Sequence, residues 1–427
     1  METGLIFVTM PKINFCILFA LTCGFLPILA AQAEAPVSVV QQRIEAAEKT
    51  VHANPSSWQP YNDLAFALCR KARDNGDISL YDQAEKALQH SRQLSADNYD
   101  AQKLEVVVLL GKHEFTQALK LATGLNKKVR DDIAGWALLV DTNVAIGNYN
   151  EAEKAAQWIL DLRPGSALGF EKAAGLREIF GDAEGAIEFF EETNRRTSQN
   201  DTDQRAWLLT QMARLELTTG NSKRAEELLS QALKLFPDSQ LALAALAKTQ
   251  MAEGNYPEAV SLFEKRYKAM PTTTKLYDWA SALDKAGMKA EASAAFSEFE
   301  SRASKDIAKS YNENLTLISY FTDYKENPGE ALRLAANESH ARQDLGTLDA
   351  YAWALYGNAR YDEAKTQLDR ALAVGVRDPV YFCHAAHIAM KTNDAAALAR
   401  FTGELKSFGP QACPLEQPTQ AAREVAP

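Results

Sequence analysis

Apolar residues recur along this chain at intervals of three and four, which is the spacing of one face of an α-helix. In a representative stretch, Trp136, Leu139 and Asn143 share such a face. Gly147 follows, and glycine closes helices because it adopts the left-handed conformation without steric cost. A second apolar stripe begins at Ala152 and continues until a proline prevents further winding. The pattern predicts two consecutive amphipathic helices.

The same two-helix pattern returns along the chain. The motif Gly-Asn-Tyr-x-Glu-Ala occupies residues 147–152 and again residues 254–259. Its final alanine has an equivalent in each unit: Ala84, Ala118, Ala152, Ala186, Ala225, Ala259, Ala292, Ala331, Ala364 and Ala397. The successive spacings are 34, 34, 34, 39, 34, 33, 39, 33 and 33 residues. A period near 34 is typical of a two-helix repeat. A small residue at this position lets the two helices cross closely, so we expect these alanines to be buried.

The composition and motifs of the sequence exclude several classes of function. Of the 427 residues, 46% are apolar, which is enough for a large core. Acidic residues number 56 and basic residues 46, so the basic surface of a nucleic-acid binder is missing. The sequence contains neither a phosphate-cradling glycine loop nor a Gly-x-Ser-x-Gly motif. His384 and His387 lie three apart without the pattern of a zinc protease, and we interpret them as a structural or solvated pair. We therefore predict no catalytic residues, no metal and no cofactor.

The repeats resemble those of the tetratricopeptide repeat (TPR) family. The match is best over residues 133–166 and 206–239. In the second of these stretches the matching residues are Leu209, Met212, Ala213, Ala225, Leu229, Ala232 and Pro237. The sixth unit departs from the family pattern at Arg266, where alanine is usual. The resemblance implies an exported bacterial TPR protein with an all-α fold, a right-handed superhelical solenoid of about ten helix-turn-helix repeats.

The positions of the repeats also predict where the parts of the chain begin and end. The mature chain divides into an amino-terminal capping helix over residues 34–56, the repeat array over 57–410 and a tail over 411–427. Extra residues near 195–205 and 301–313 predict joints that divide the array into blocks. The first unit also contains extra residues, and we expect 72–80 (ARDNGDISL) to form a bulging loop.

The first 33 residues have the features of a signal peptide. Lys12 precedes an apolar run over residues 13–31, and Ala31-Gln32-Ala33 provides the small-x-small pattern that signal peptidase cleaves. Cleavage after Ala33 would make Glu34 the first residue of an exported, periplasmic protein. The alternative is that residues 13–31 anchor the chain in the inner membrane, because the run is just long enough to span a bilayer.

The TPR resemblance implies that first helices line a concave groove, which holds a protein or an extended peptide. We predict ligand-binding residues in repeats seven to nine, where the groove positions carry aromatic side chains beside carboxylates. These residues are Tyr277, Tyr320, Asp323, Tyr324, Asp349, Trp353 and Tyr356. The alternative, that some of these rings pack against the adjacent repeat, stays open at this point.

These observations predict a non-catalytic protein- or peptide-binding scaffold in the cell envelope. The alternative is an accessory or regulatory subunit that positions an enzyme or its substrate in an envelope assembly. In either case the expected partner is a protein or an extended peptide. We expect neither a nucleic acid nor a small-molecule cofactor as partner, and membrane contact only through an uncleaved signal sequence.

Three cysteines remain once residues 1–33 are removed. Cys69 lies within LAFALCRKA and is expected to be a small buried residue. Cys383 lies near the start of the first helix of the tenth repeat, and Cys413 follows the end of the second. Antiparallel helices bring these two ends together, which predicts a disulfide. Two unpaired thiols are the alternative.

Overall fold

The computed structural model describes residues 39–408 and residue 413. These residues form α-helices and one short 3-10 helix, and no strand occurs among them. The helices are α1 (Val39–Ala53), α2 (Gln59–Asn75), α3 (Ser79–Leu94), α4 (Tyr99–Gly111), α5 (Phe115–Lys128), α6 (Ile133–Ile146), α7 (Tyr149–Leu162), α8 (Ala167–Ile179), α9 (Ala183–Arg196), α10 (Thr202–Thr218), α11 (Ser222–Leu235), α12 (Gln240–Ala252), α13 (Tyr256–Ala269), α14 (Thr273–Lys285), α15 (Lys289–Ala303), α16 (Asn314–Asp323), α17 (Pro328–Ala341), α18 (Leu345–Gly357), α19 (Tyr361–Leu372), α20 (Pro379–Lys391), α21 (Ala395–Leu405) and η1 (Lys406–Phe408).

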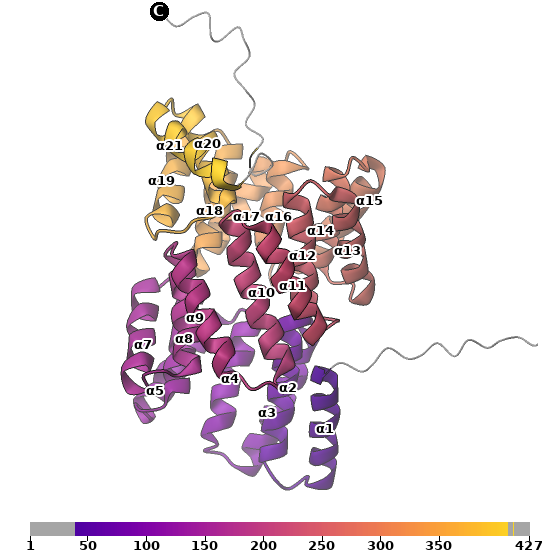
Figure 1. The fold of residues 1–427 in the computed structure, drawn as a ribbon, viewed down its shortest axis with the longest axis vertical. Helices are drawn as coiled ribbons and strands as arrows, with labels where there is room; N and C mark the ends of the chain where they lie inside the picture. Colours follow the sequence, from indigo (N-terminus) through magenta and orange to yellow (C-terminus); the bar gives the residue numbers. More distant parts are fainter. Residues whose placement is uncertain (1–38, 409–412, 414–427) are drawn as a thin grey trace, which may run out of the picture. The chain divides into compact units, whose positions relative to one another are not determined.

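After α1, the helices pack as successive antiparallel pairs, from α2 with α3 to α20 with α21 (Figure 1). The first helices of neighbouring repeats also contact one another, as α2 contacts α4 and α4 contacts α6. This packing confirms an all-α solenoid of ten two-helix repeats, as the period of the sequence predicts. Helix α1 packs against α2 of the first pair, and its buried residues are Val40, Ile44 and Ala47.

The alanines of the repeat motif lie where the two helices of each repeat meet. Nine of them, from Ala84 to Ala364, are completely or almost completely buried. Ala397 of the tenth repeat is only half-buried. No eleventh repeat follows α21 among the described residues, so nothing there covers this position from the next repeat.

The extra residues of the first repeat do not form the bulging loop expected over 72–80. Helix α2 continues to Asn75, and α3 already begins at Ser79. The expectation was wrong because the extra residues lengthen α2, and Gly76 ends it in the left-handed conformation.

The two regions proposed as joints differ in how closely their flanking helices pack. Helices α9 and α10 remain closely packed across residues 195–205, whereas α15 and α16 make few contacts across residues 301–313. The proposed signal peptide lies outside the described residues, as does the tail apart from Cys413.

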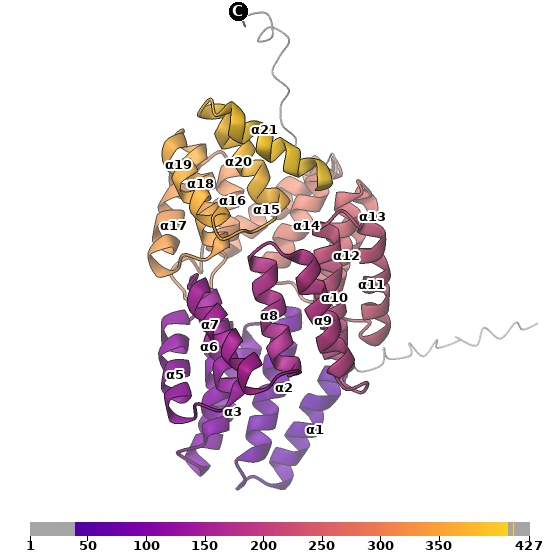
Figure 2. The same ribbon diagram turned by 60° about the vertical axis from the view of Figure 1, so that its left-hand side comes forward.

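Distant repeats contact one another directly, which the repeat period does not predict. Arg70 of α2 pairs with Asp201 at 2.9 Å and with Asp203 of α10 at 2.5 Å. Arg43 of α1 pairs with the same two carboxylates at 3.0 and 2.7 Å. Figures 1 and 2 show α1 and α2 beside α10. The first repeat therefore packs against the fifth.

A second contact joins α2 to the sixth repeat. Asp74 accepts hydrogen bonds from Ser239 Oγ at 2.8 Å and from the backbone N–H of Gln240 at 3.1 Å. These groups lie at the amino terminus of α12, where backbone N–H groups lack partners within their own helix. A carboxylate from the first repeat thus helps to cap a helix that begins 166 residues later.

A third set of contacts joins the third and fourth repeats to the ninth and tenth. The backbone N–H of Leu345 donates to Tyr149 Oη at 2.8 Å, and that of Gln343 donates to the carbonyl of Ile146 at 3.2 Å. The turn at Gly181 approaches the turn at Gly375 so closely that a Cβ added to Gly181 would lie 2.1 Å from the Gly375 carbonyl oxygen. The approach of Gly181 to Gly375 is between backbone atoms, so it leaves little room for substitution.

Candidate functional site

Three of the tyrosines proposed as ligand-binding residues lie in the aromatic core of repeats seven and eight. Tyr320 is only 3% exposed, and its hydroxyl donates to Glu300 at 3.0 Å. Tyr277 and Tyr324 are half-buried and pack on Phe296, with ring centroids 5.8 and 4.3 Å apart. Their packing matches the alternative reading, in which rings at helical spacing fill the interior.

The other four proposed residues lie on the inner helices of repeats eight and nine, beside the first helix of repeat ten. Trp353 of α18 stacks on Tyr356, with ring centroids 4.7 Å apart, and donates from Nε1 to Asp323 at 2.6 Å. Its ring also stacks on His384 of α20 at 3.9 Å. We call Asp323, Asp349, Trp353, Tyr356, His384 and His387 the aromatic–carboxylate cluster. The sequence analysis predicted four of these six residues to bind a ligand.

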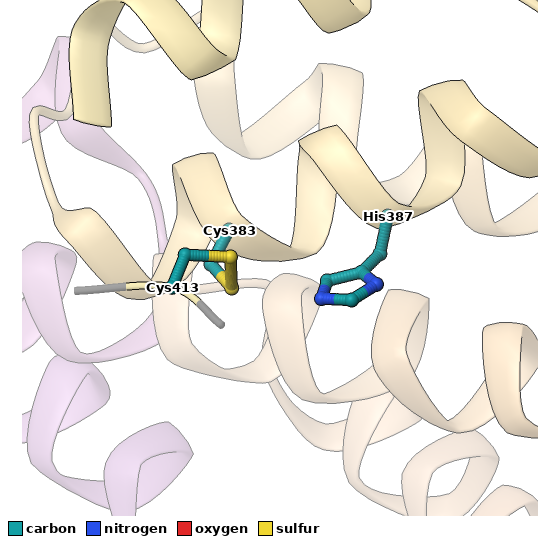
Figure 3. Close-up of side chains that lie close together, drawn as sticks. All are labelled: Cys383, His387 and Cys413. Carbon is teal, nitrogen blue, oxygen red and sulfur yellow. A yellow bond between two sulfur atoms is a disulfide. The ribbon is translucent and has the colours of Figure 1, made fainter. Parts of the chain in front are cut away.

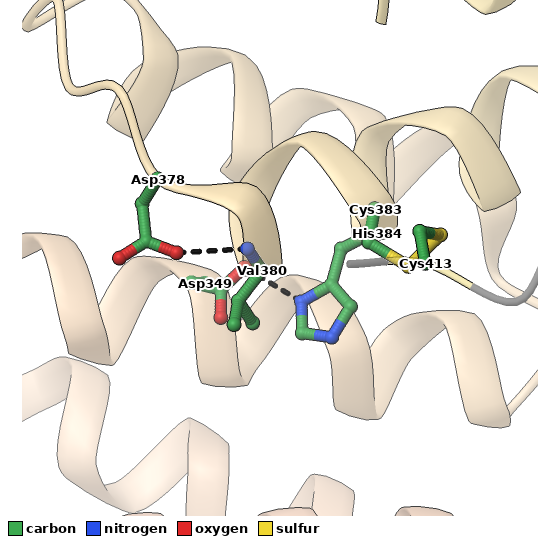
Figure 4. Close-up of a disulfide and its surroundings, with 6 residues drawn as sticks. All are labelled: Asp349, Asp378, Val380, Cys383, His384 and Cys413. Atoms are coloured by element: carbon green, nitrogen blue, oxygen red, sulfur yellow. Dashed lines mark hydrogen bonds and ion pairs between the residues drawn. A yellow bond between two sulfur atoms is a disulfide. The ribbon is translucent and has the colours of Figure 1, made fainter. Parts of the chain in front are cut away.

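The two histidines of this cluster differ in their surroundings. His384 Nδ1 lies 2.8 Å from Asp349, whose side chain is buried (Figure 4). Burial lowers the pKa of His384, but the charge of Asp349 and the hydrogen bond to it outweigh this, and the pKa is raised. His387 lies against Trp353 and Tyr356 at ring distances of 5.8 and 6.1 Å. Most of the contacts of the cluster are thus between its own members. Ligand binding by the cluster stays a prediction.

The sequence missed an opening at the other end of the array, which we call the N-terminal groove. Its volume is about 730 Å³, and it is lined by α2, α4, α6 and α8. Its apolar wall consists of Phe66, Leu104, Val107, Ala134, Leu138 and Leu168. Phe66 is 51% exposed although it lies in the middle of α2. The segment LAFALC is apolar on every side of the helix, whereas a helix with one buried face needs only one apolar stripe. The apolar residues outside that stripe could have indicated the groove.

Four cations line the N-terminal groove. Three of them pair with carboxylates, whereas Arg73 donates a hydrogen bond to the side-chain amide oxygen of Gln204 at 3.0 Å. Lys172 pairs with Asp141 at 2.8 Å, and Lys103 with Asp132 at 3.2 Å. Burial lowers the pKa of Lys172, but the two neighbouring carboxylates outweigh it and the pKa is raised, so the lysine remains charged. Arg70 is held by Asp201 and Asp203, as described above. The groove is therefore an apolar surface whose polar border is neutralised by ion pairs except at Arg73.

The described residues contain one group of three potential metal ligands, which is formed by Cys383, His387 and Cys413. The two cysteines form a disulfide with a Cα–Cα distance of 5.4 Å. The remaining cysteine, Cys69, is buried, and burial raises its pKa to about 12. None of the helices in the described part of the chain is both long and apolar enough to span a membrane.

Paired helices, a 34-residue period and an inner groove define this chain as a helical repeat solenoid that resembles TPR solenoids. The family model of the tetratricopeptide repeat matches residues 216–277, from the end of α10 into α14. The matched segment is a small part of the chain, and no catalytic family was found. A search of curated proteins gave no match.

Solved structures share the helical architecture at low sequence identity. A chain in the structure of the APC/C hetero-tetramer Cut9-Hcn1 is 14% identical over 84% of this chain, with a TM-score of 0.49, and this chain spans 58% of that chain. PilW, a type IV pilus biogenesis factor, is 14% identical over 48% of this chain and 93% of its own, with a TM-score of 0.42. The human IFIT1 dimer with PPP-AAAA is 12% identical over 88% and 96%, with a TM-score of 0.46. These likenesses carry no argument about function.

Proposed function

We propose that this protein is a non-catalytic scaffold that binds an extended peptide of a partner protein in the N-terminal groove. One observation carries the proposal: a cavity of about 730 Å³ on the inner helices exposes the ring of Phe66 and an apolar wall to solvent. Exposed apolar surface inside a concavity is the usual anchor for a ligand, because binding removes it from water.

The side chains that line the groove indicate which kind of peptide fits it. Lys103 and Lys172 already pair with neighbouring carboxylates, so neither lysine offers an unpaired charge to a ligand. Its wall consists of side chains from four successive first helices, which run alongside one another. An extended segment with apolar side chains fits this surface, with its backbone exposed to the polar border. The aromatic–carboxylate cluster offers less apolar surface to a ligand, because Trp353 already donates a hydrogen bond to Asp323 and stacks on His384.

We expect Phe66→Ala to weaken peptide binding by about tenfold or more, since an aromatic anchor in a desolvated pocket carries much of the binding energy. The mature protein would be used to select unstructured peptides from a display library, and the affinities of the selected peptides would be measured by calorimetry. The melting temperature of Phe66→Ala should stay close to that of the unaltered protein, because the ring is half-exposed.

Leu94→Ala is the matched control for this experiment. Leu94 is 44% exposed at the end of α3 and is not among the residues that line the groove. Selected peptides should therefore bind this variant normally. If Phe66→Ala binds them as well as Leu94→Ala does, or if only Trp353→Ala reduces binding, the N-terminal groove is not the site.

We further propose that the protein acts in the cell envelope after export. The support is Lys12, the apolar run over residues 13–31 and Ala31-Gln32-Ala33. Amino-terminal sequencing of the native protein should give Glu34 as the first residue. A protein that retains residues 13–31 would instead support the anchored alternative or a protein that is not exported.

A further inference from the structure

Three side chains with the chemistry of metal ligands meet at the carboxyl-terminal end of the array. Cys383 and His387 lie on α20, and Cys413 lies beyond η1 (Figure 3). One ligand atom from each lies within 4.8 Å of the other two. All three residues are partly buried, so the group is shielded but reachable from solvent.

The fold holds this group together from both sides. Cys383 and His387 are four residues apart on one helix, so both side chains project from the same face. The short helix η1 packs against α20 as well: the ring of Phe408 lies 6.1 Å from that of Phe382. Phe382 also packs on Phe401 of α21. These ring contacts therefore hold α21 and η1 against α20 independently of the disulfide.

We propose that reduction of the Cys383–Cys413 disulfide converts this group into a Cys₂His site for Zn²⁺. A dithiol reductant would supply two electrons and two protons, which break the S–S bond and give two thiols, while the reductant becomes a disulfide. Zn²⁺ then binds both sulfurs as thiolates, and the two thiol protons pass to solvent. His387 contributes the third ligand through a ring nitrogen. The disulfide and the metal exclude each other, because both use the same sulfurs.

The donor set and the distances suit zinc. Two thiolates and an imidazole with water in the fourth position form a recognised type of zinc site. With Zn–S and Zn–N bonds of about 2.3 and 2.0 Å, tetrahedral ligands lie about 3.5 to 4 Å apart. On reduction the two bonded sulfurs would move apart to this spacing, while their separations from His387, now within 4.8 Å, would need to shorten by up to roughly an ångström. Cys413 can supply this adjustment, since it does not belong to a helix. This inference is independent of the proposed peptide groove.

The first measurement tests the thiols themselves. Alkylation of the unfolded native protein without reductant should label Cys69 and no other cysteine of the mature chain. After reduction of the folded protein, Co²⁺ alone should bind with a stoichiometry of one per chain and give a thiolate-to-cobalt charge-transfer band. Zn²⁺ should displace it, and the disulfide form should give no band. Labelling of Cys383 and Cys413 in the unreduced protein, or equal metal binding by both forms, would overturn the proposal.

The second measurement assigns the third ligand. In reduced protein, His387→Ala should weaken Zn²⁺ binding by about 100-fold, measured by competition with a chromophoric chelator. His340→Ala, which removes an exposed histidine of α17, should leave the affinity unchanged. Cys69→Ser should also bind normally. Unchanged affinity in His387→Ala would overturn the assigned site. Because this variant retains both cysteines, its folding can be checked in the disulfide form before reduction.

Discussion

Replacing Gly181 by alanine is expected to destabilise the protein far more than the same replacement at Gly254. Both glycines follow a first helix, α8 and α12 respectively, and both adopt a positive φ, of 80° and 77°. Alanine at either position carries the penalty of a left-handed conformation, about 1 kcal/mol. At Gly181 the new Cβ would also lie 2.1 Å from the carbonyl oxygen of Gly375, whereas at Gly254 it would meet nothing within 4 Å.

The additional cost at Gly181 should be about 1 to 3 kcal/mol, because the clash is with backbone that cannot rotate away. Thermal unfolding followed by circular dichroism would compare Gly181→Ala with Gly254→Ala. We expect a separate early transition in the first variant as α19 to α21 lose their contact with the fourth repeat. Equal melting curves for the two variants would mean that the turns at Gly181 and Gly375 do not touch in solution.

Replacing Lys275 by methionine should stabilise the protein by up to about 3 kcal/mol at neutral pH. Lys275 is only 3% exposed, and its Nζ finds no hydrogen-bond partner within the described part of the chain. Burial and the nearby Arg266 lower its pKa from 10.5 to about 8. Methionine has a similar length and no charge, so it should fill the same space without this penalty.

The pH dependence distinguishes this cause from better packing. Below pH 8 the lysine is protonated in both folded and unfolded chains, and the unaltered protein bears the full penalty of a buried charge. Between pH 8 and 10.5 the folded chain loses this proton while the unfolded chain keeps it, so stability rises with pH. The advantage of Lys275→Met in urea titrations should therefore be largest at pH 7 and decrease by pH 10. An advantage that stays constant over this range would exclude the charge as its cause.

The sequence by itself determined the repeat. Helical spacing, a glycine after the first helix and an alanine at the crossing are local requirements of a two-helix unit, so each is visible within 34 residues. The burial of the alanines from Ala84 to Ala364 confirms this reading. The approach of Cys383 and Cys413 was predicted in the same way, from the two ends of one antiparallel helix pair; whether the native protein forms the disulfide stays a prediction.

The tertiary structure decided how repeats far apart in the sequence meet and which side chains of the inner helices remain exposed to solvent. Tyr320 and Phe66 occupy similar inner helices, yet Tyr320 is covered by Phe296 and Phe299 while Phe66 faces the N-terminal groove. The contact of Asp74 with α12 and that of Gly181 with Gly375 likewise join segments more than 160 residues apart. A repeat pattern describes contacts between neighbours only. Small rotations from repeat to repeat accumulate along the array, and their sum decides which distant surfaces touch.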